Sequence, residues 1–186
     1  MKSGIHSNNG NQTKAARFKE NRDPGSAYKT RTDKAQQLHT FVMASCNATN
    51  EKDLEKNLSN IKYFIDINAS AILLERSANQ DSHLNDALHL PFSCQQNKQF
   101  AQIISCRLFD LLVHKMKKRL HNDQFPRLML QNRTKDGFMV LHCAVKSAYP
   151  DMVAKVITLL EEHPEALKAN LLNITQDGFM VLQHAL

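Results

Sequence analysis

The feature that most constrains the fold is an eight-residue phrase that occurs twice near the end of the chain. Thr-Lys-Asp-Gly-Phe-Met-Val-Leu at residues 134–141 returns as Thr-Gln-Asp-Gly-Phe-Met-Val-Leu at residues 175–182, so seven of eight positions are identical at an offset of 41 residues. A match of this length at a fixed spacing is typical of a repeat array. In each copy Asp-Gly predicts a tight turn, because glycine tolerates the positive φ that such turns need.

The residues between the two turns have the pattern of a helical hairpin. An apolar run at 138–145 predicts a short helix, and Pro150 and Asp151 suit the first turn of a second helix. The apolar face of that second helix consists of Met152, Val153, Val156, Ile157 and Leu160. His163-Pro164 ends it, because the residue before proline is pushed away from helical geometry. We therefore expect a turn, a short helix, a reversal, a longer amphipathic helix, a loop and the next turn.

This order, with these residues, resembles the ankyrin repeat, whose units begin Asp-Gly-x-Thr-Pro-Leu-His-x-Ala. The first copy matches that pattern at Asp136, Gly137, Leu141, His142 and Ala144. It departs from the pattern where Met and Val replace Thr-Pro. In the family the Thr hydroxyl and the His ring link neighbouring turns, so the resemblance implies an array less regular than the consensus.

The second copy carries the same marks at Asp177, Gly178 and Leu182. The second helix of the first unit also matches the family, because residues 156–160 fit Val-x-x-Leu-Leu. A period of 41 residues lies within the range of HEAT-type helical pairs as well, which is the main alternative. Asp-Gly before the first helix and Leu-His within it favour ankyrin.

We therefore expect an all-α fold, a helical-hairpin solenoid of about three and a half ankyrin-like repeats over residues 33–186. The clearest repeat is 134–174, followed by a half repeat at 175–186. Upstream, the Leu-His pairs at 38 and 88 indicate the starts of two degenerate repeats. Asp33 is a plausible N-cap, and Asn50 is expected to cap the next helix. A short helix is expected near residues 72–74 and a long one from about Lys98 to Leu120, with an apolar face of Phe100, Ile103, Ile104, Leu108, Leu111, Leu112 and Met116.

Residues 1–32 are expected to form a basic, disordered tail. Residues 1–34 hold eight Lys or Arg against three acids, so most of the formal net charge of +6 lies there. Few large apolar side chains occur in this stretch to offset the entropy of ordering it. Such an arm can attach to nucleic acid or to anionic lipid, but its dispersed charges favour a soluble leader, and a nucleic-acid partner is not expected.

Neither a secretory signal nor a membrane-spanning stretch is recognised in the sequence. The four cysteines at 46, 94, 106 and 143 are widely separated within apolar helical patterns. This placement favours reduced, buried thiols and a cytoplasmic location over a disulfide framework.

The sequence contains weak signals for chemistry. The nine histidines lack recognisable zinc spacing, and no phosphate loop, nucleophile elbow or paired-carboxylate motif occurs. His39, His89 and His142 each follow a leucine and are interpreted as structural residues of the repeats. We therefore expect no metal, no cofactor, no small-molecule substrate and no catalytic activity.

One dense basic cluster lies in the body of the chain, formed by Lys115, Lys117, Lys118 and Arg119. Cations at the C-terminal end of a helix complement the helix dipole, which is the simpler interpretation. The alternative is a docking patch for phosphate or for an acidic protein surface, and these four residues are the candidate partner-binding site.

The half repeat at 175–186 is expected to pack on the unit before it. Its apolar side chains are too many for one neighbour to cover, so part of this surface should stay exposed. Two explanations are open: the chain is cut from a longer array, or it associates end to end with itself or a partner.

Helical repeats build extended surfaces that bind proteins, so the expected function is a non-catalytic protein-interaction scaffold. Degenerate ankyrin sequences rich in Asn, Gln, Lys and His resemble those of intracellular bacterial pathogens. That resemblance implies an effector delivered by a type IV secretion system into the host cytosol, where it binds a host protein. Two alternatives are an ankyrin-like part of a larger enzyme, and a nucleic-acid or anionic-membrane binder acting through the tail.

Overall fold

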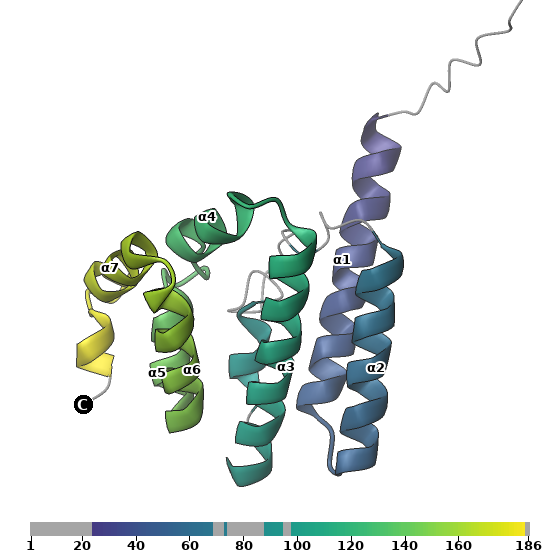
Figure 1. Cartoon of the computed structure of the whole chain (residues 1–186), viewed down its shortest axis with the longest axis horizontal. Helices are drawn as coiled ribbons and strands as arrows, with labels where there is room; N and C mark the ends of the chain where they lie inside the picture. Colours follow the sequence, from purple (N-terminus) through teal and green to yellow (C-terminus); the bar gives the residue numbers. More distant parts are fainter. Residues whose placement is uncertain (1–23, 69–72, 74–87, 95–97, 185–186) are drawn as a thin grey trace, which may run out of the picture.

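The computed structural model describes residues 24–68, 73, 88–94 and 98–184 (Figure 1). This part of the chain contains seven α-helices and two short 3₁₀ helices. Its one β-type pairing is an isolated antiparallel bridge between Ile174 and Met180. The expectation of an all-α fold is therefore confirmed for the described residues.

The helices are arranged as successive pairs. The pairs are α1 (Pro24–Cys46) with α2 (Glu51–Ile67), η2 (Leu90–Ser93) with α3 (Lys98–Arg119), and α5 (Val140–Ser147) with α6 (Pro150–Glu161). Three further elements are α4 (Gln124–Gln131), α7 (Pro164–Leu172) and η3 (Val181–His184).

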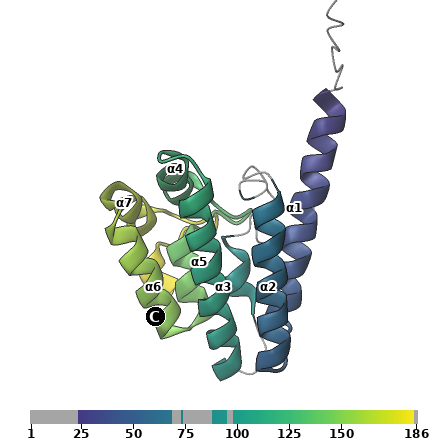
Figure 2. The same ribbon diagram turned by 45° about the vertical axis from the view of Figure 1, so that its right-hand side comes forward.

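These elements form two rows. In the first row α1 contacts η2, η2 contacts α5, and α5 contacts η3. In the second row α2 contacts α3, and α3 contacts α6. Helices α4 and α7 pack on each other and lie together towards one end of the α5–α6 pair, as the two views agree (Figures 1 and 2). Successive pairs are therefore neighbours in space, whereas α4 packs mainly on α7, which lies much later in the chain.

Local signals in the sequence set several helix boundaries. The side chain of Asn50 accepts a hydrogen bond from the backbone N–H of Asp53 at 2.9 Å, which satisfies one of the unpaired donors at the start of α2. Pro150 occupies the first turn of α6, where its missing N–H has no cost, and Asp151 follows it. The long helix expected near Lys98 is α3. These three predictions are confirmed.

The start of the first helix was predicted wrongly. Helix α1 begins at Pro24, so Asp33 is not an N-cap, and residues 24–32 are helical where a disordered tail was expected. Pro24 suits a first helical turn, and the Lys, Arg, Gln and Ala residues after it have high helix propensity. The rest of the expected tail, residues 1–23, lies outside the described residues.

The prediction of a loop after α6 is also wrong, because this segment is a helix. Pro164 both ends α6 and opens α7, with Glu165 in the first turn. Helix α4 occupies the same place before the first Asp-Gly turn as α7 does before the second, and their ranges lie about 41 residues apart. The unit that begins at residue 134 therefore has three helices, not two.

The buried apolar side chains form one continuous cluster that runs through every helix pair. Leu38, Leu54, Leu108 and Val156 are each fully buried within it. Ile103 was expected on the apolar face of α3 but is 43% exposed. Of the short helix expected near residues 72–74, only Leu73 is described, and it is buried.

Candidate interaction surfaces

The two Asp-Gly phrases fold into the same turn. Gly137 and Gly178 both have φ of +83°, which a residue with a Cβ adopts only with strain. In the first turn the N–H of Thr134 donates to the carbonyl of Phe138 at 2.8 Å, and the hydroxyl of Thr134 accepts from the N–H of Phe138 at 3.1 Å. The second turn repeats both bonds between residues 175 and 179, at 3.0 and 3.2 Å. Equal sequence has therefore produced equal geometry.

The second turn stacks directly on the first. The backbone N–H of Gln176 donates to the carbonyl of Asp136 at 3.1 Å, and its side-chain amide donates to the carbonyl of Lys135 at 2.8 Å. The amide of Asn173 donates to the carbonyl of Gly137 at 2.8 Å. A Cβ at Gly137 would lie 3.3 Å from the nitrogen of Gln176, so glycine also permits this close approach. The two bonds from Gln176 thus join consecutive units, and the bond from Asn173 holds the segment that leads into the second turn against the first turn.

The remaining repeat positions differ between the two copies. Leu141, His142 and Ala144 are buried in α5, whereas Leu182, which is equivalent to Leu141, is 70% exposed. Asp177 and Gly178 are also exposed. The half repeat packs through its buried Val181, while Leu182 belongs to the apolar surface that was expected to stay exposed.

Asn170 of α7 is a connecting residue that sequence reasoning missed. Its side-chain oxygen accepts from the N–H of Leu141 at 3.2 Å, and its amide donates to the carbonyls of Met129 at 3.1 Å and Ala166 at 2.8 Å. It is fully buried between α4, α5 and α7. Nothing in the neighbouring sequence distinguishes Asn170 from the exposed asparagines. The one available signal is that Asn has low propensity for the interior of a helix.

The histidines of the three Leu-His pairs are core residues. His39, His89 and His142 are each at most 3% exposed. The ring of His142 lies 6.0 Å from that of Phe138 and 5.8 Å from that of His184. Burial and the nearby His184 lower the pKa of His142 to about 4, against the smaller opposing effects of the Phe179 and Asn173 backbone. This side chain is therefore neutral at physiological pH.

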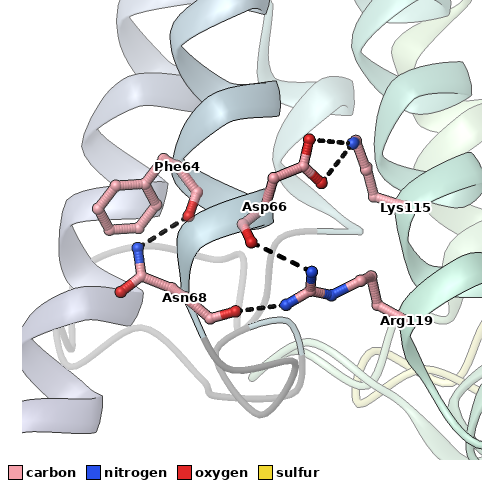
Figure 3. Close-up of polar contacts among 5 residues, drawn as sticks. All are labelled: Phe64, Asp66, Asn68, Lys115 and Arg119. Carbon is pink, nitrogen blue, oxygen red and sulfur yellow. Dashed lines mark hydrogen bonds and ion pairs between the residues drawn. The ribbon is translucent and has the colours of Figure 1, made fainter.

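Two members of the basic cluster at the end of α3, Lys115 and Arg119, point towards the end of α2 (Figure 3). The ammonium of Lys115 contacts both carboxylate oxygens of Asp66 in α2, at 2.6 and 2.7 Å. This hydrogen bond holds the pKa of Asp66 below its usual value, with smaller contributions from Arg119 and Lys118. Lys115 is 4% exposed, so its interpretation as a partner-docking residue is wrong.

Arg119 completes the end of α2. Its guanidinium donates to the carbonyl of Asp66 at 3.2 Å and to the carbonyl of Asn68, while the amide of Asn68 donates back to the carbonyl of Phe64 at 2.8 Å (Figure 3). The last carbonyls of a helix have no partners within it, so these bonds cap α2 from the neighbouring helix.

The other two members of the cluster point elsewhere. Lys117 pairs with Glu162 after α6 at 2.6 Å, and this bond lowers the pKa of Glu162. Lys118 is exposed. The four basic residues therefore do not form one docking patch, because three of them connect α3 to the helices on either side.

The same kind of contact recurs along the second row. Arg107 of α3 pairs with both Glu51 and Glu55 of α2. On the opposite side of α3, Asp110 pairs with Lys155 of α6 at 2.7 Å. Charged side chains of the second row are thus largely used to hold its own helices together.

The cysteines lie mainly in the core. Cys46, Cys94 and Cys143 are buried as expected, and none of the four cysteines forms a disulfide. The phenol of Tyr149 donates to the carbonyl of Cys94 at 2.7 Å, which ties the start of α6 to the end of η2.

Across the described ranges, no group of three or more His, Cys, Asp or Glu side chains is placed to hold a metal ion. None of the described helices is long and apolar enough to cross a membrane. The chain matches no protein-family model, no curated protein and no solved structure.

Proposed function

We propose that this chain is a non-catalytic scaffold, built from ankyrin-like helical repeats, that binds another protein. The observation that carries the proposal is the stack of the two Asp-Gly turns, in which Gln176 donates to the carbonyls of Lys135 and Asp136. A turn that stacks on its own copy is how a repeat array extends. The two rows of helices support the same reading, since each pair packs on the next.

The binding surface is assigned to the exposed edge formed by the turns and the first row. Several charged groups of the second row, among them Glu55, Lys115 and Lys155, are engaged in contacts between α2, α3 and α6. A side chain that already holds two helices together cannot be exchanged freely for partner recognition. Lys135 in the first turn is exposed, and its backbone carbonyl alone takes part in the stack. It is the best single probe of this edge.

Binding to a host protein after type IV secretion is the corresponding proposal for cellular context, and it derives from the resemblance to bacterial ankyrin effectors. A secretion assay with a reporter fused to the full chain tests this part separately. Reporter signal in host cytosol that depends on the secretion system would support it.

The scaffold proposal is tested by capture of partners from eukaryotic cell extract on the immobilised full chain, followed by titration of each purified partner. Lys135→Glu should weaken a genuine complex by about tenfold, which corresponds to about 1.4 kcal/mol. The matched control is Lys62→Glu, the same charge change at an exposed position of α2, and it should leave affinity unchanged. Absence of any saturable partner, or loss of binding only with Lys62→Glu, would overturn the assignment.

A further inference from the structure

Two of the four cysteines lie together in the core, although they are far apart in the chain. Cys46 is the last residue of α1, and Cys94 follows directly after η2, 48 positions later. The packing of α1 on η2 brings the two residues into one region. Each of them is 2% exposed, so the protein encloses the pair.

Contacts on both residues place the two thiols side by side. The thiol of Cys46 donates to the carbonyl of Leu90, the first residue of η2, at 3.8 Å. A thiol is a weak donor, so this bond leaves the sulfur of Cys46 able to turn. The side chain of Cys46 is also a hydrogen-bonding partner of the Cys94 thiol. The phenol of Tyr149 holds the backbone of Cys94 by donating to its carbonyl at 2.7 Å. The two sulfur atoms are therefore near each other while the backbone of Cys94 is fixed.

The surroundings of Cys94 favour its thiolate, which is the reactive form of a cysteine. The hydrogen bond with Cys46 lowers the pKa of Cys94 most, and the nearby hydroxyl of Ser105 lowers it further, against the opposing effect of burial. Cys106 is more exposed, but burial raises its pKa. Accessibility alone would make Cys106 the first thiol to react, whereas thiolate content favours Cys94.

We propose that Cys46 and Cys94 form a redox modification site, at which a peroxide oxidises the two thiols to a disulfide that links the end of α1 to the end of η2. Cys94 loses its proton, and its sulfur attacks one oxygen of hydrogen peroxide. The O–O bond breaks, which leaves a sulfenic acid on Cys94 and releases hydroxide that takes up the proton as water. The sulfur of Cys46 then displaces the sulfenic hydroxyl, which leaves with the proton of the Cys46 thiol as a second water. Two thiols are oxidised while one peroxide is reduced to two waters.

Burial determines which product forms. A thiol of another protein molecule cannot reach a sulfur enclosed in the core, so the oxidised Cys94 is left with Cys46 as its partner. Burial also slows the first step, because the peroxide enters only when the structure opens locally. Both cysteines lie at the ends of helical elements, where such opening disrupts the fewest contacts. The expected reaction is therefore slow and intramolecular, and it is independent of the protein-binding role because it needs no partner.

The test treats the full chain with hydrogen peroxide and then counts thiols with a chromogenic thiol reagent after unfolding. The expected result is a fall from four thiols to two per chain, with the mass of a monomer lowered by two hydrogens. Dithiothreitol should restore all four. Peptide mapping without reduction should find the peptide that contains Cys46 joined to the peptide that contains Cys94.

Matched cysteine variants separate the pair from the other thiols. Cys106→Ser and Cys143→Ser should still form the link, each falling from three thiols to one. Cys46→Ser and Cys94→Ser should give no intramolecular disulfide. Circular dichroism checks that each variant folds, and Cys46→Ala replaces Cys46→Ser if the buried hydroxyl prevents folding.

Three results would overturn the proposal. The first is retention of all four thiols after prolonged exposure of the folded chain to peroxide. The second is oxidation that occurs first at Cys106, or that joins two molecules. The third is an intramolecular disulfide that persists in Cys46→Ser or Cys94→Ser, because the bond would then join other cysteines.

Discussion

Alanine substitutions at the two turn glycines should have unequal effects on stability, although the glycines have the same conformation. Both have φ of +83°, so alanine at either position carries the strain of a left-handed residue, about 1–2 kcal/mol. Part of this is offset, because alanine also reduces the entropy of the unfolded chain by about 0.4–1 kcal/mol. The expected net cost of Gly178→Ala is therefore about 1 kcal/mol.

Gly137→Ala has a further cost, because its Cβ would lie 3.3 Å from the nitrogen of Gln176 and 3.5 Å from the Cα of Thr175. The second turn must move, which weakens the bonds that Gln176 and Asn173 make to the first turn. Each neutral hydrogen bond contributes about 0.5–1.5 kcal/mol net. Losing one or two of the three raises the cost of Gly137→Ala to about 2–3 kcal/mol.

The assay is urea unfolding followed by far-ultraviolet circular dichroism, with hydrogen exchange at the amide of Gln176 as the local probe. Gly137→Ala should lower the free energy of unfolding by about 1–2 kcal/mol more than Gly178→Ala does, and should speed exchange at Gln176. Gly137→Asn separates the two causes, because asparagine tolerates this φ better but still carries a Cβ. Equal losses for the two alanine variants would refute the idea that the turn stack contributes to stability.

Three further changes test other contacts. Asp66→Asn should lower the melting temperature more than Lys115→Met, because the first leaves a buried ammonium unpaired while the second leaves a carboxylate that water can reach. The pKa of His142 falls from 6.5 to about 4 on folding, so the unfolded chain takes up a proton first. Stability should decline as pH drops from 6.5 towards 4, by up to about 3 kcal/mol, and His142→Gln should flatten this slope in urea titrations. Asn170→Ala should cost about 2–3 kcal/mol in unfolding free energy, since it leaves the Leu141 N–H and a carbonyl unpaired.

Each of these three predictions has an outcome that contradicts it. Equal melting temperatures for the Asp66 and Lys115 variants would mean that the ammonium reaches water. An unchanged pH slope in His142→Gln would assign that slope to other groups. A loss below about 0.5 kcal/mol in Asn170→Ala would show that water replaces its bonds.

Features encoded by a few neighbouring residues could be predicted from the sequence. Asn50 caps α2, Pro150 opens α6, and each Asp-Gly makes the same turn. In each case the physical cause is local, because a side chain or a fixed φ acts on backbone within three residues. Helix α7 was missed because Pro164 was interpreted only as a stop, and its short apolar pattern is weak.

The burial and pairing of a residue could not be predicted where its contacts lie far along the chain. Lys115 looks like a solvated lysine until Asp66, 49 positions earlier, is brought beside it by the packing of α2 on α3. Leu141 and Leu182 lie in the same local sequence, yet one is buried and the other exposed. No local pattern distinguishes them, because burial depends on the unit that follows.

The arrangement in two rows has a consequence for how the protein folds. Within a row each element contacts the next one, and short loops join α1 to α2 and α5 to α6, so the contacts within these two pairs form with little loop closure. Folding that starts in one helix pair can therefore spread to the next, and local unfolding can begin at an end without disrupting the middle. Amide exchange should be slowest where α3 packs against helices on both sides, and fastest in η3, so protection should be graded along the chain.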